Sequence, residues 1–334
     1  LDTCMAFTPY VEERIATLPH DARARLAGLA DRIVLGSDFP NIPYPYADQI
    51  SGLAGLELGA MHLGLAALAM PVRAGLVPTL VPLAKPLRFA ADILARNLNA
   101  GRGRKPAFID SRGTWTYGQL AERVGKFAGL LRSLGVRREE RVLICLLDTI
   151  DWPTAFLGCL KAGVVAVPVN TLMTEDDYRY MLADSRARLL VVSDALYPRF
   201  EKLIEEAPDL EHVIVSGGNA HGLKSFEALM DSAKVCTEVA PTACDDIAFW
   251  LYTSGSTGKP KGAVHVHADL KLTDDLYGAP IVGITENDIC YSVAKLFFAY
   301  GLGNALTFPM SAGACTVLLP DRPTPDGVAA LLRQ

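Results

Sequence analysis

A short run of glycines, hydroxyl residues and lysines is the part of the sequence best suited to chemistry. Residues 252–262 read YTSGSTGKPKG and lie between two apolar segments, IAFWLY and AVHVH. Glycines leave backbone N–H groups open to close approach, so these groups and the hydroxyls can converge on phosphate oxygens. The lysines at the far end add positive charge. The expected phosphate-binding residues are Thr253, Ser254, Gly255, Ser256, Thr257, Gly258, Lys259 and Lys261.

Two other interpretations of this region are weaker. The NTPase P-loop does not fit, because Pro260 rather than Ser or Thr follows Lys259, and Thr253 stands where the first glycine would be. A flexible surface loop would not need this ordered pattern between two apolar strands. His265 and His267 would lie on one face of a strand, but no Cys, Asp or Glu lies at a matching offset. No metal site is therefore expected.

The run TSGSTGKPKG resembles, residue for residue, the signature loop of the adenylate-forming superfamily. The resemblance implies that the loop at 253–261 binds the β- and γ-phosphates of Mg-ATP while a substrate carboxylate attacks the α-phosphorus. Acyl-AMP and pyrophosphate would form, with phosphate charge neutralised by lysines, backbone N–H groups and Mg²⁺. The implied small-molecule partners are ATP, Mg²⁺ and coenzyme A.

A second motif, KLFFAYGLGN at 295–304, resembles the acyl-pocket motif in the form typical of benzoate-type CoA ligases. Most of 87–334 resembles those ligases as well. Aromatic rings would provide flat apolar walls for an aryl acid, and Gly301 would leave room beside it. For Phe297 or Phe298 alone, packing in the core is an equally good interpretation. The expected pocket residues are Phe298, Ala299, Tyr300 and Gly301.

The elements that position these motifs follow from the pattern of apolar residues. From about residue 104, apolar β-rich runs alternate with amphipathic helical runs, which predicts an α/β fold of layered, mainly parallel sheets flanked by helices. Strands are expected at 141–147 and 164–170, with a helix at 151–163 between them that ends at Gly163. Thr174 is expected to cap the next helix. The glycine-rich run is expected to be a loop between two strands.

The chain is expected to have three parts. Residues 1–50 resemble the C-terminal end of an amidohydrolase, 51–86 form an apolar helical connection, and 87–334 resemble the truncated N-terminal portion of a ligase. In that family a lysine from a small C-terminal domain contacts the adenylate, so no catalytic residue is assigned here. Asp38, in GSDFP, resembles a metal-binding aspartate at a strand end, but a lone aspartate cannot hold a catalytic metal. We therefore expect the chain to be a fragment or a fusion.

Charge, apolar runs and cysteine content argue against a nucleic-acid-binding, membrane-spanning or secreted protein. A formal net charge of −5 gives no basic surface for nucleic acid. The apolar run at 58–72 is too short to span a bilayer, and the start of the chain does not resemble a signal peptide. Seven scattered cysteines without a C-x-x-C pair suggest reduced thiols and a cytoplasmic protein. The oligomeric state is not indicated by the sequence.

The sequence is compatible with three hypotheses about function. The first is a ligase, expected to be incomplete at its C-terminal end, that activates a benzoate-like acid to acyl-AMP and then to acyl-CoA. The second is a non-catalytic nucleotide-binding module. The third is a fragment of a metal-dependent amidohydrolase, which rests on Asp38.

Overall fold

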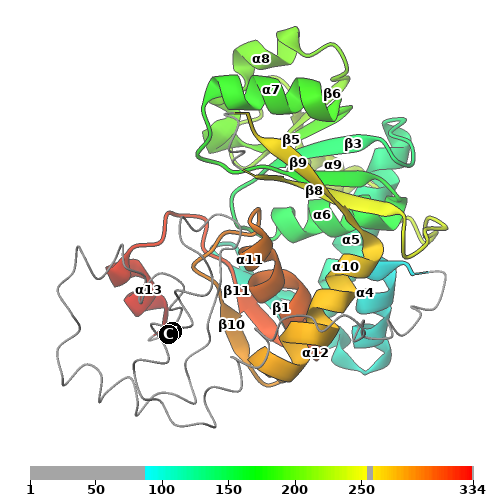
Figure 1. Ribbon diagram of the computed structural model, residues 1–334, viewed down its shortest axis with the longest axis vertical. Coiled ribbons are helices and arrows are strands. Elements are labelled where there is room, and N and C mark those ends of the chain that lie inside the picture. Colours follow the sequence, from blue (N-terminus) through cyan, green and yellow to red (C-terminus); the bar gives the residue numbers. More distant parts are fainter. Residues whose placement is uncertain (1–86, 254–258, 333–334) are drawn as a thin grey trace, which may run out of the picture. The chain divides into compact units, whose positions relative to one another are not determined.

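The structure, a computed structural model, describes residues 87–253 and 259–332. Within these ranges a seven-stranded sheet has the order β7-β6-β5-β3-β4-β8-β9, and a four-stranded sheet has the order β10-β11-β1-β2 (Figure 1). Helices flank the sheets, so the predicted α/β fold class is confirmed. The segments expected at 1–50 and 51–86, with Asp38, lie outside the described residues.

The seven-stranded sheet is parallel except at one edge, where β8 and β9 pair antiparallel. The central strand β5 is buried along its whole length and β3 is buried from Val142 onward, which explains their apolar sequences, LLVVS and VLIC. The strands of this sheet are β3 (Arg141–Cys145), β4 (Val165–Pro168), β5 (Leu189–Ser193), β6 (His212–Ser216), β7 (Lys224–Ser225), β8 (Ile247–Thr253) and β9 (Lys261–Val266).

The four-stranded sheet pairs segments that are far apart in sequence. β1 pairs parallel with β11 through Phe108 and Thr316, and antiparallel with β2. Its other edge is β10, which pairs parallel with β11. The strands are β1 (Pro106–Asp110), β2 (Gly113–Thr116), β10 (Ile289–Tyr291) and β11 (Cys315–Val317).

The helices begin and end largely where local signals predict. α6 spans Asp151–Ala162 and ends at Gly163, whose φ of 73° is the left-handed conformation that favours glycine. Thr174 caps α7 by accepting a hydrogen bond from the Asp177 N–H at 3.2 Å. Both predictions are confirmed. The α-helices are α4 (Phe89–Asn99), α5 (Tyr117–Ser133), α6, α7 (Glu175–Ser185), α8 (Glu201–Glu206), α9 (Phe226–Ser232), α10 (His267–Thr273), α11 (Ala299–Leu302), α12 (Phe308–Ala312) and α13 (Pro325–Leu332).

Shorter helical turns complete the described chain. Two of them are 3₁₀ turns and two are π-helical turns. One π-helical turn precedes the aromatic motif, and the other begins at the last two residues of the motif. The four turns are η3 (Arg102–Arg104), η4 (Asp194–Arg199), η5 (Asp274–Val282) and η6 (Gly303–Thr307).

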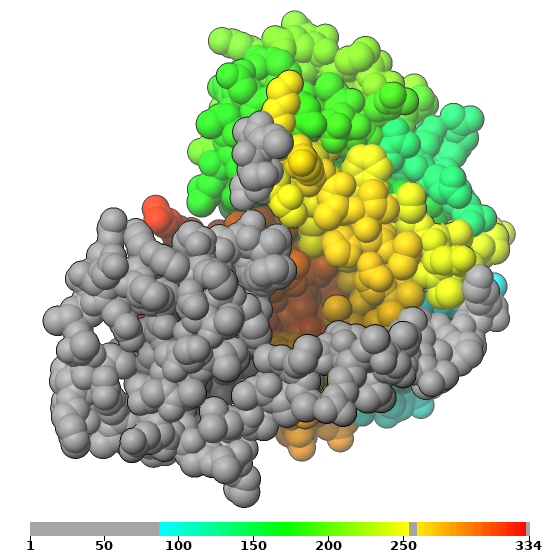
Figure 2. Space-filling model, viewed as in Figure 1, coloured from blue at the N-terminus to red at the C-terminus, as the bar shows by residue number. Residues whose placement is uncertain are grey.

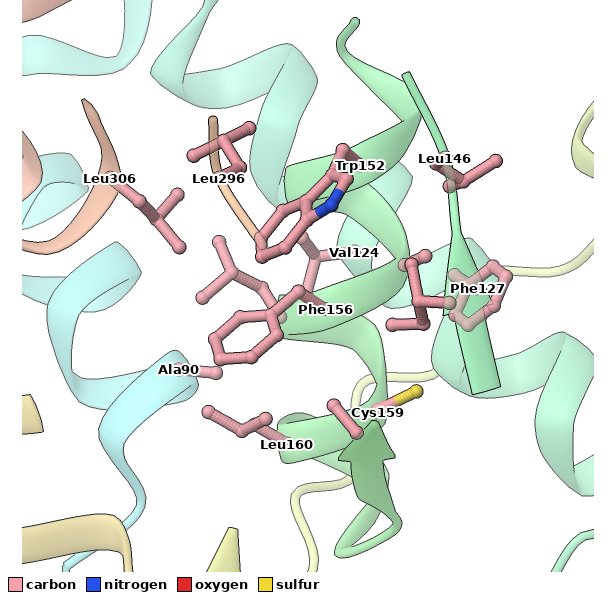
Figure 3. Packing of buried hydrophobic residues seen from close by; sticks show 14 of the residues in the cluster. Ala90, Val124, Phe127, Leu146, Trp152, Phe156, Cys159, Leu160, Leu296 and Leu306 are labelled. Carbon is pink, nitrogen blue, oxygen red and sulfur yellow. The ribbon is translucent and has the colours of Figure 1, made fainter. Parts of the chain in front are cut away.

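The largest core cluster lies around α6. Trp152 and Phe156 stack with ring centroids 5.1 Å apart, and Phe156 meets Phe249 of β8 edge-on at 5.6 Å. Figure 3 shows Leu296 and Leu306 reaching the same cluster from the aromatic-motif region. Burial of these side chains joins β8 and the aromatic motif to one packed interior, which fixes both against α6.

Candidate functional site

The predicted phosphate loop joins two paired strands. β8 ends at Thr253 and β9 begins at Lys261, and these two residues lie opposite each other in the antiparallel register. The predicted strand–loop–strand arrangement is therefore confirmed at both flanks. Because β8 runs parallel to β4, the loop leaves the sheet at its carboxyl edge, where α/β sheets bind ligands. The predicted residues Ser254, Gly255, Ser256, Thr257 and Gly258 lie outside the described residues.

Helix α7 contacts both flanks of this loop. The Tyr252 hydroxyl donates a hydrogen bond to Asp184 Oδ2 at 2.7 Å, and Lys259 Nζ lies 5.3 Å from the centroid of the Tyr180 ring. Tyr180 and Asp184 are four residues apart and so share one face of the helix. Burial, followed by the Asp184 carboxylate, raises the pKa of the Tyr252 hydroxyl, which therefore stays protonated as a donor. Tyr180 and Asp184 are not predictable from the sequence, because nothing local links α7 to β8.

The two lysines of the loop provide positive charge at the surface. Lys259 and Lys261 are exposed, and neither forms a salt bridge with another described residue. Figure 2 shows β9 and α10, in yellow to light orange, at the surface of the face in view. Two accessible ammonium groups beside the loop favour an anionic ligand such as a polyphosphate.

The aromatic motif places its two phenylalanines in different environments. Phe297 is buried, whereas Phe298 is 47 % exposed, and their ring centroids lie 4.5 Å apart. Phe298 immediately precedes α11, where Ala299 is exposed and Tyr300 is 45 % exposed. The core interpretation therefore describes Phe297, while Phe298, Ala299 and Tyr300 are accessible to a ligand.

Gly301 is buried against the backbone. A Cβ atom at this position would lie 2.0 Å from the Lys295 carbonyl oxygen and 2.6 Å from that of Ala294. Such contacts are far inside the van der Waals limit, so glycine is required for α11 to pack on the preceding loop. The structure thus gives Gly301 a backbone-packing role, and the space beside an aryl ring stays a prediction.

The lysine that opens the motif connects three segments. The Lys295 ammonium donates hydrogen bonds to the carbonyls of Leu319 and Asp321 and lies 3.9 Å from Asp148 Oδ2. Burial raises the pKa of Asp148 to about 7, although Lys295 and the Leu296 N–H oppose the shift. Burial also lowers the pKa of Lys295. Neither Asp148 nor Lys295 is a site residue predicted from the sequence.

The two histidines after the loop have separate environments. His265 in β9 stacks on Phe249 with ring centroids 4.7 Å apart and is hydrogen-bonded to Asp269 at 3.0 Å. His267 begins α10, is 1 % exposed, and has no hydrogen-bond partner on either ring nitrogen within the described part of the chain. Among residues 87–253 and 259–332, no group of three or more His, Cys, Asp or Glu side chains could hold a metal ion.

Across residues 87–253 and 259–332, no hydrogen bond or ion pair links the flanks of the phosphate loop to Phe298, Ala299 or Gly301. In the same ranges, none of the helices has the length and apolarity to cross a membrane.

The family described as AMP-binding enzyme matches residues 95–334. The chain is 50 % identical over 258 residues to a benzoate–CoA ligase of Thauera aromatica, a match that covers 77 % of this chain and 49 % of that protein. It is 42 % identical over 244 residues to a 4-hydroxybenzoate–CoA/benzoate–CoA ligase of Rhodopseudomonas palustris, covering 73 % and 45 %. The chain spans about half the length of these curated relatives.

Solved structures agree with these matches. A benzoate CoA ligase from Burkholderia xenovorans LB400 superposes with a TM-score of 0.68 at 49 % identity, covering 74 % of this chain and 48 % of that one. The anthranilate CoA ligase AuaEII in complex with anthranoyl-AMP has a TM-score of 0.69 at 37 % identity, with coverage of 73 % and 46 %. Both are similar in fold and in sequence.

Proposed function

The chain belongs to the AMP-binding enzyme family, and we propose that it activates an aromatic carboxylic acid of the benzoate class with Mg-ATP. The acid carboxylate attacks the α-phosphorus, forming acyl-AMP and releasing pyrophosphate. The thiol of coenzyme A then attacks the acyl carbonyl, which gives the thioester and releases AMP. The proposal rests on residues 87–334, and it assigns no proton transfer to a residue of this chain.

The observation that carries the proposal is the antiparallel pairing of the two strands that flank the phosphate loop. Thr253 and Lys261 lie opposite each other at the carboxyl edge of the sheet, so the sequence SGSTGKP connects two neighbouring strand ends. A segment rich in Gly, Ser and Thr can offer several hydrogen-bond donors to one phosphate group. Lys259 and Lys261 neutralise charge on the transferred and leaving groups, which favours in-line displacement.

The class of acid is supported by the aromatic motif and by the relatives. Phe298 and Tyr300 are exposed rings at the start of α11, with the small side chain of Ala299 between them. Exposed aromatic rings suit a flat aryl group better than a flexible acyl chain. The similar proteins act on benzoate, 4-hydroxybenzoate and anthranilate by their names.

We place the protein in the cytoplasm, with small molecules rather than nucleic acid as its partners. All six cysteines within the described ranges are free thiols, which suits a reducing compartment. A net charge of −5 disfavours a nucleic-acid partner.

The test is benzoate-dependent release of pyrophosphate from Mg-ATP. The unmodified chain is compared with Lys259→Ala and with Lys271→Ala, a control that removes a surface lysine paired with Asp275. We expect release that needs benzoate, falls by roughly tenfold or more in Lys259→Ala, and is unchanged in Lys271→Ala. Mg-ATP binding without any release would instead indicate a nucleotide-binding module, and absence of both would refute the proposal.

A further inference from the structure

The Lys295 side chain contacts two segments outside its own loop, one after β11 and one after β3. Its ammonium donates to the carbonyls of Leu319 and Asp321, the latter at 2.7 Å, just after β11 in the four-stranded sheet. It also lies 3.9 Å from Asp148 Oδ2, just after β3 in the seven-stranded sheet. The Lys295 side chain is only 18 % exposed, so these contacts are largely shielded from water.

Asp148 depends on Lys295 for its charge partner. The carboxyl group is 6 % exposed, and its Oδ1 atom has no hydrogen-bond partner among the described residues. Removing one member of a buried ion pair leaves the other uncompensated, which costs more than the pair itself contributes. Lys295 Nζ and Asp148 Oδ2 therefore form a shielded contact, and the Leu296 N–H is the other group that stabilises the Asp148 carboxylate.

The backbone of Lys295 supports the start of α11. The Phe298 N–H donates to the Lys295 carbonyl at 3.0 Å, and the Leu302 N–H donates to the Phe298 carbonyl at 2.8 Å. Gly301 packs on the same Lys295 carbonyl without an intervening side chain. A shift of Lys295 is thus transmitted directly to Phe298 and to the first turn of α11.

We propose that Lys295 is a positioning residue for the aryl pocket, because its ammonium joins the ends of β3 and β11 and its carbonyl fixes the residues from Phe298 to Gly301. The proposal rests on the proposed function where it assigns Phe298 and Tyr300 to the pocket. Lys295 does not itself contact the acid in this account. Its removal should change the binding of benzoate more than the binding of Mg-ATP.

The test variant is Lys295→Met, which keeps the length of the side chain and removes its charge and donors. Lys295→Arg keeps a cationic donor and should restore part of the effect. Lys126→Met is the matched control, because Lys126 is similarly shielded, at 24 % exposed, and forms its salt bridge with Glu122 within one helix. If Lys295→Met does not fold, Lys295→Gln replaces it in the same comparison.

Amide hydrogen exchange tests the positioning claim without any ligand. We expect faster exchange at Phe298 and Leu302 in Lys295→Met, with α5 unchanged and with no such effect in Lys126→Met. Unchanged exchange at both amides would overturn the proposal, whatever the protein binds.

Calorimetric titration then tests the consequence for binding. We expect the affinity for benzoate to fall by about tenfold, equivalent to about 1.4 kcal/mol, while the affinity for Mg-ATP stays within about twofold. Equal benzoate affinities in Lys295→Met and the unmodified chain would contradict the positioning role. If the unmodified chain binds no benzoate, the proposed function fails at that point, and the exchange result alone decides the role of Lys295.

Discussion

The hydroxyl of Tyr252 donates a hydrogen bond to Asp184 Oδ2 at 2.7 Å, which joins the last turn of α7 to the strand that leads into the phosphate loop. On the far side of that loop, Lys259 lies over the ring of Tyr180, one turn earlier on the same helix. One helix therefore contacts the residue before the loop and a lysine near the end of the loop. Such support orders the flanks before a nucleotide arrives, which reduces the entropy lost on binding.

Removing the Tyr252 hydroxyl should weaken both the fold and nucleotide binding. Because Asp184 is exposed, we expect Tyr252→Phe to lower the free energy of unfolding by only about 1 kcal/mol. The affinity for Mg-ATP should fall by roughly threefold to tenfold, since the loop loses one of its two supports. Denaturant unfolding and calorimetry measure the two effects.

A double-mutant cycle provides the control for this bond. Asp184→Ala should have a similar effect, and the double variant should be little worse than either single one, because the partners act together. Additive losses in the double variant would show that the hydrogen bond does not couple α7 to β8.

Adding one methyl group at Gly301 should disrupt the start of α11. In Gly301→Ala the new Cβ would lie 2.0 Å from the Lys295 carbonyl oxygen, so backbone must move. We expect a loss of about 1 to 3 kcal/mol or more in the free energy of unfolding. Gly103→Ala is the matched control, because its Cβ would meet only Leu98 Cδ2, at 3.6 Å. Equal stabilities of the two variants would contradict the packing role of Gly301.

The buried imidazole of His267 should make the fold sensitive to acid. Burial lowers the pKa of His267 to about 4, although the charge of Asp246 opposes the shift. In the unfolded chain the same group binds a proton near its ordinary value of about 6.5. Its contribution to stability is therefore complete above pH 6.5 and is lost as the pH falls from about 6.5 to about 4.

Unfolding experiments across this range isolate the contribution of His267. Between about pH 7 and pH 4, the unmodified chain should lose roughly 3 kcal/mol more stability than His267→Leu. His265→Leu controls for the loss of a partly exposed histidine from the same segment. Parallel pH profiles for the unmodified chain and His267→Leu would refute the assignment.

Local signals made part of this structure predictable. The end of α6 at Gly163, the Thr174 cap and the strands around the loop depend on neighbours within a few residues, which a single sequence displays. The contact between Tyr252 and Asp184 joins residues 68 apart, and the Asp148–Lys295 pair joins two sheets. Such long-range contacts depend on the order of strands in the sheets, which the spacing of apolar residues in the sequence does not specify. Gly301 shows the same limit, since a sequence does not reveal what a missing side chain would have met.

In the proposed reaction a carboxylate oxygen attacks the α-phosphorus of ATP, and the transfer of that oxygen to AMP tests this step. The chain is incubated with Mg-ATP, coenzyme A and benzoate labelled with ¹⁸O in both carboxylate oxygens, and the nucleotide products are analysed by mass spectrometry. We expect AMP that carries one ¹⁸O atom, because the bridging oxygen of benzoyl-AMP stays with phosphorus when the acyl group is transferred to the thiol. Unlabelled AMP or ADP as the product would contradict it.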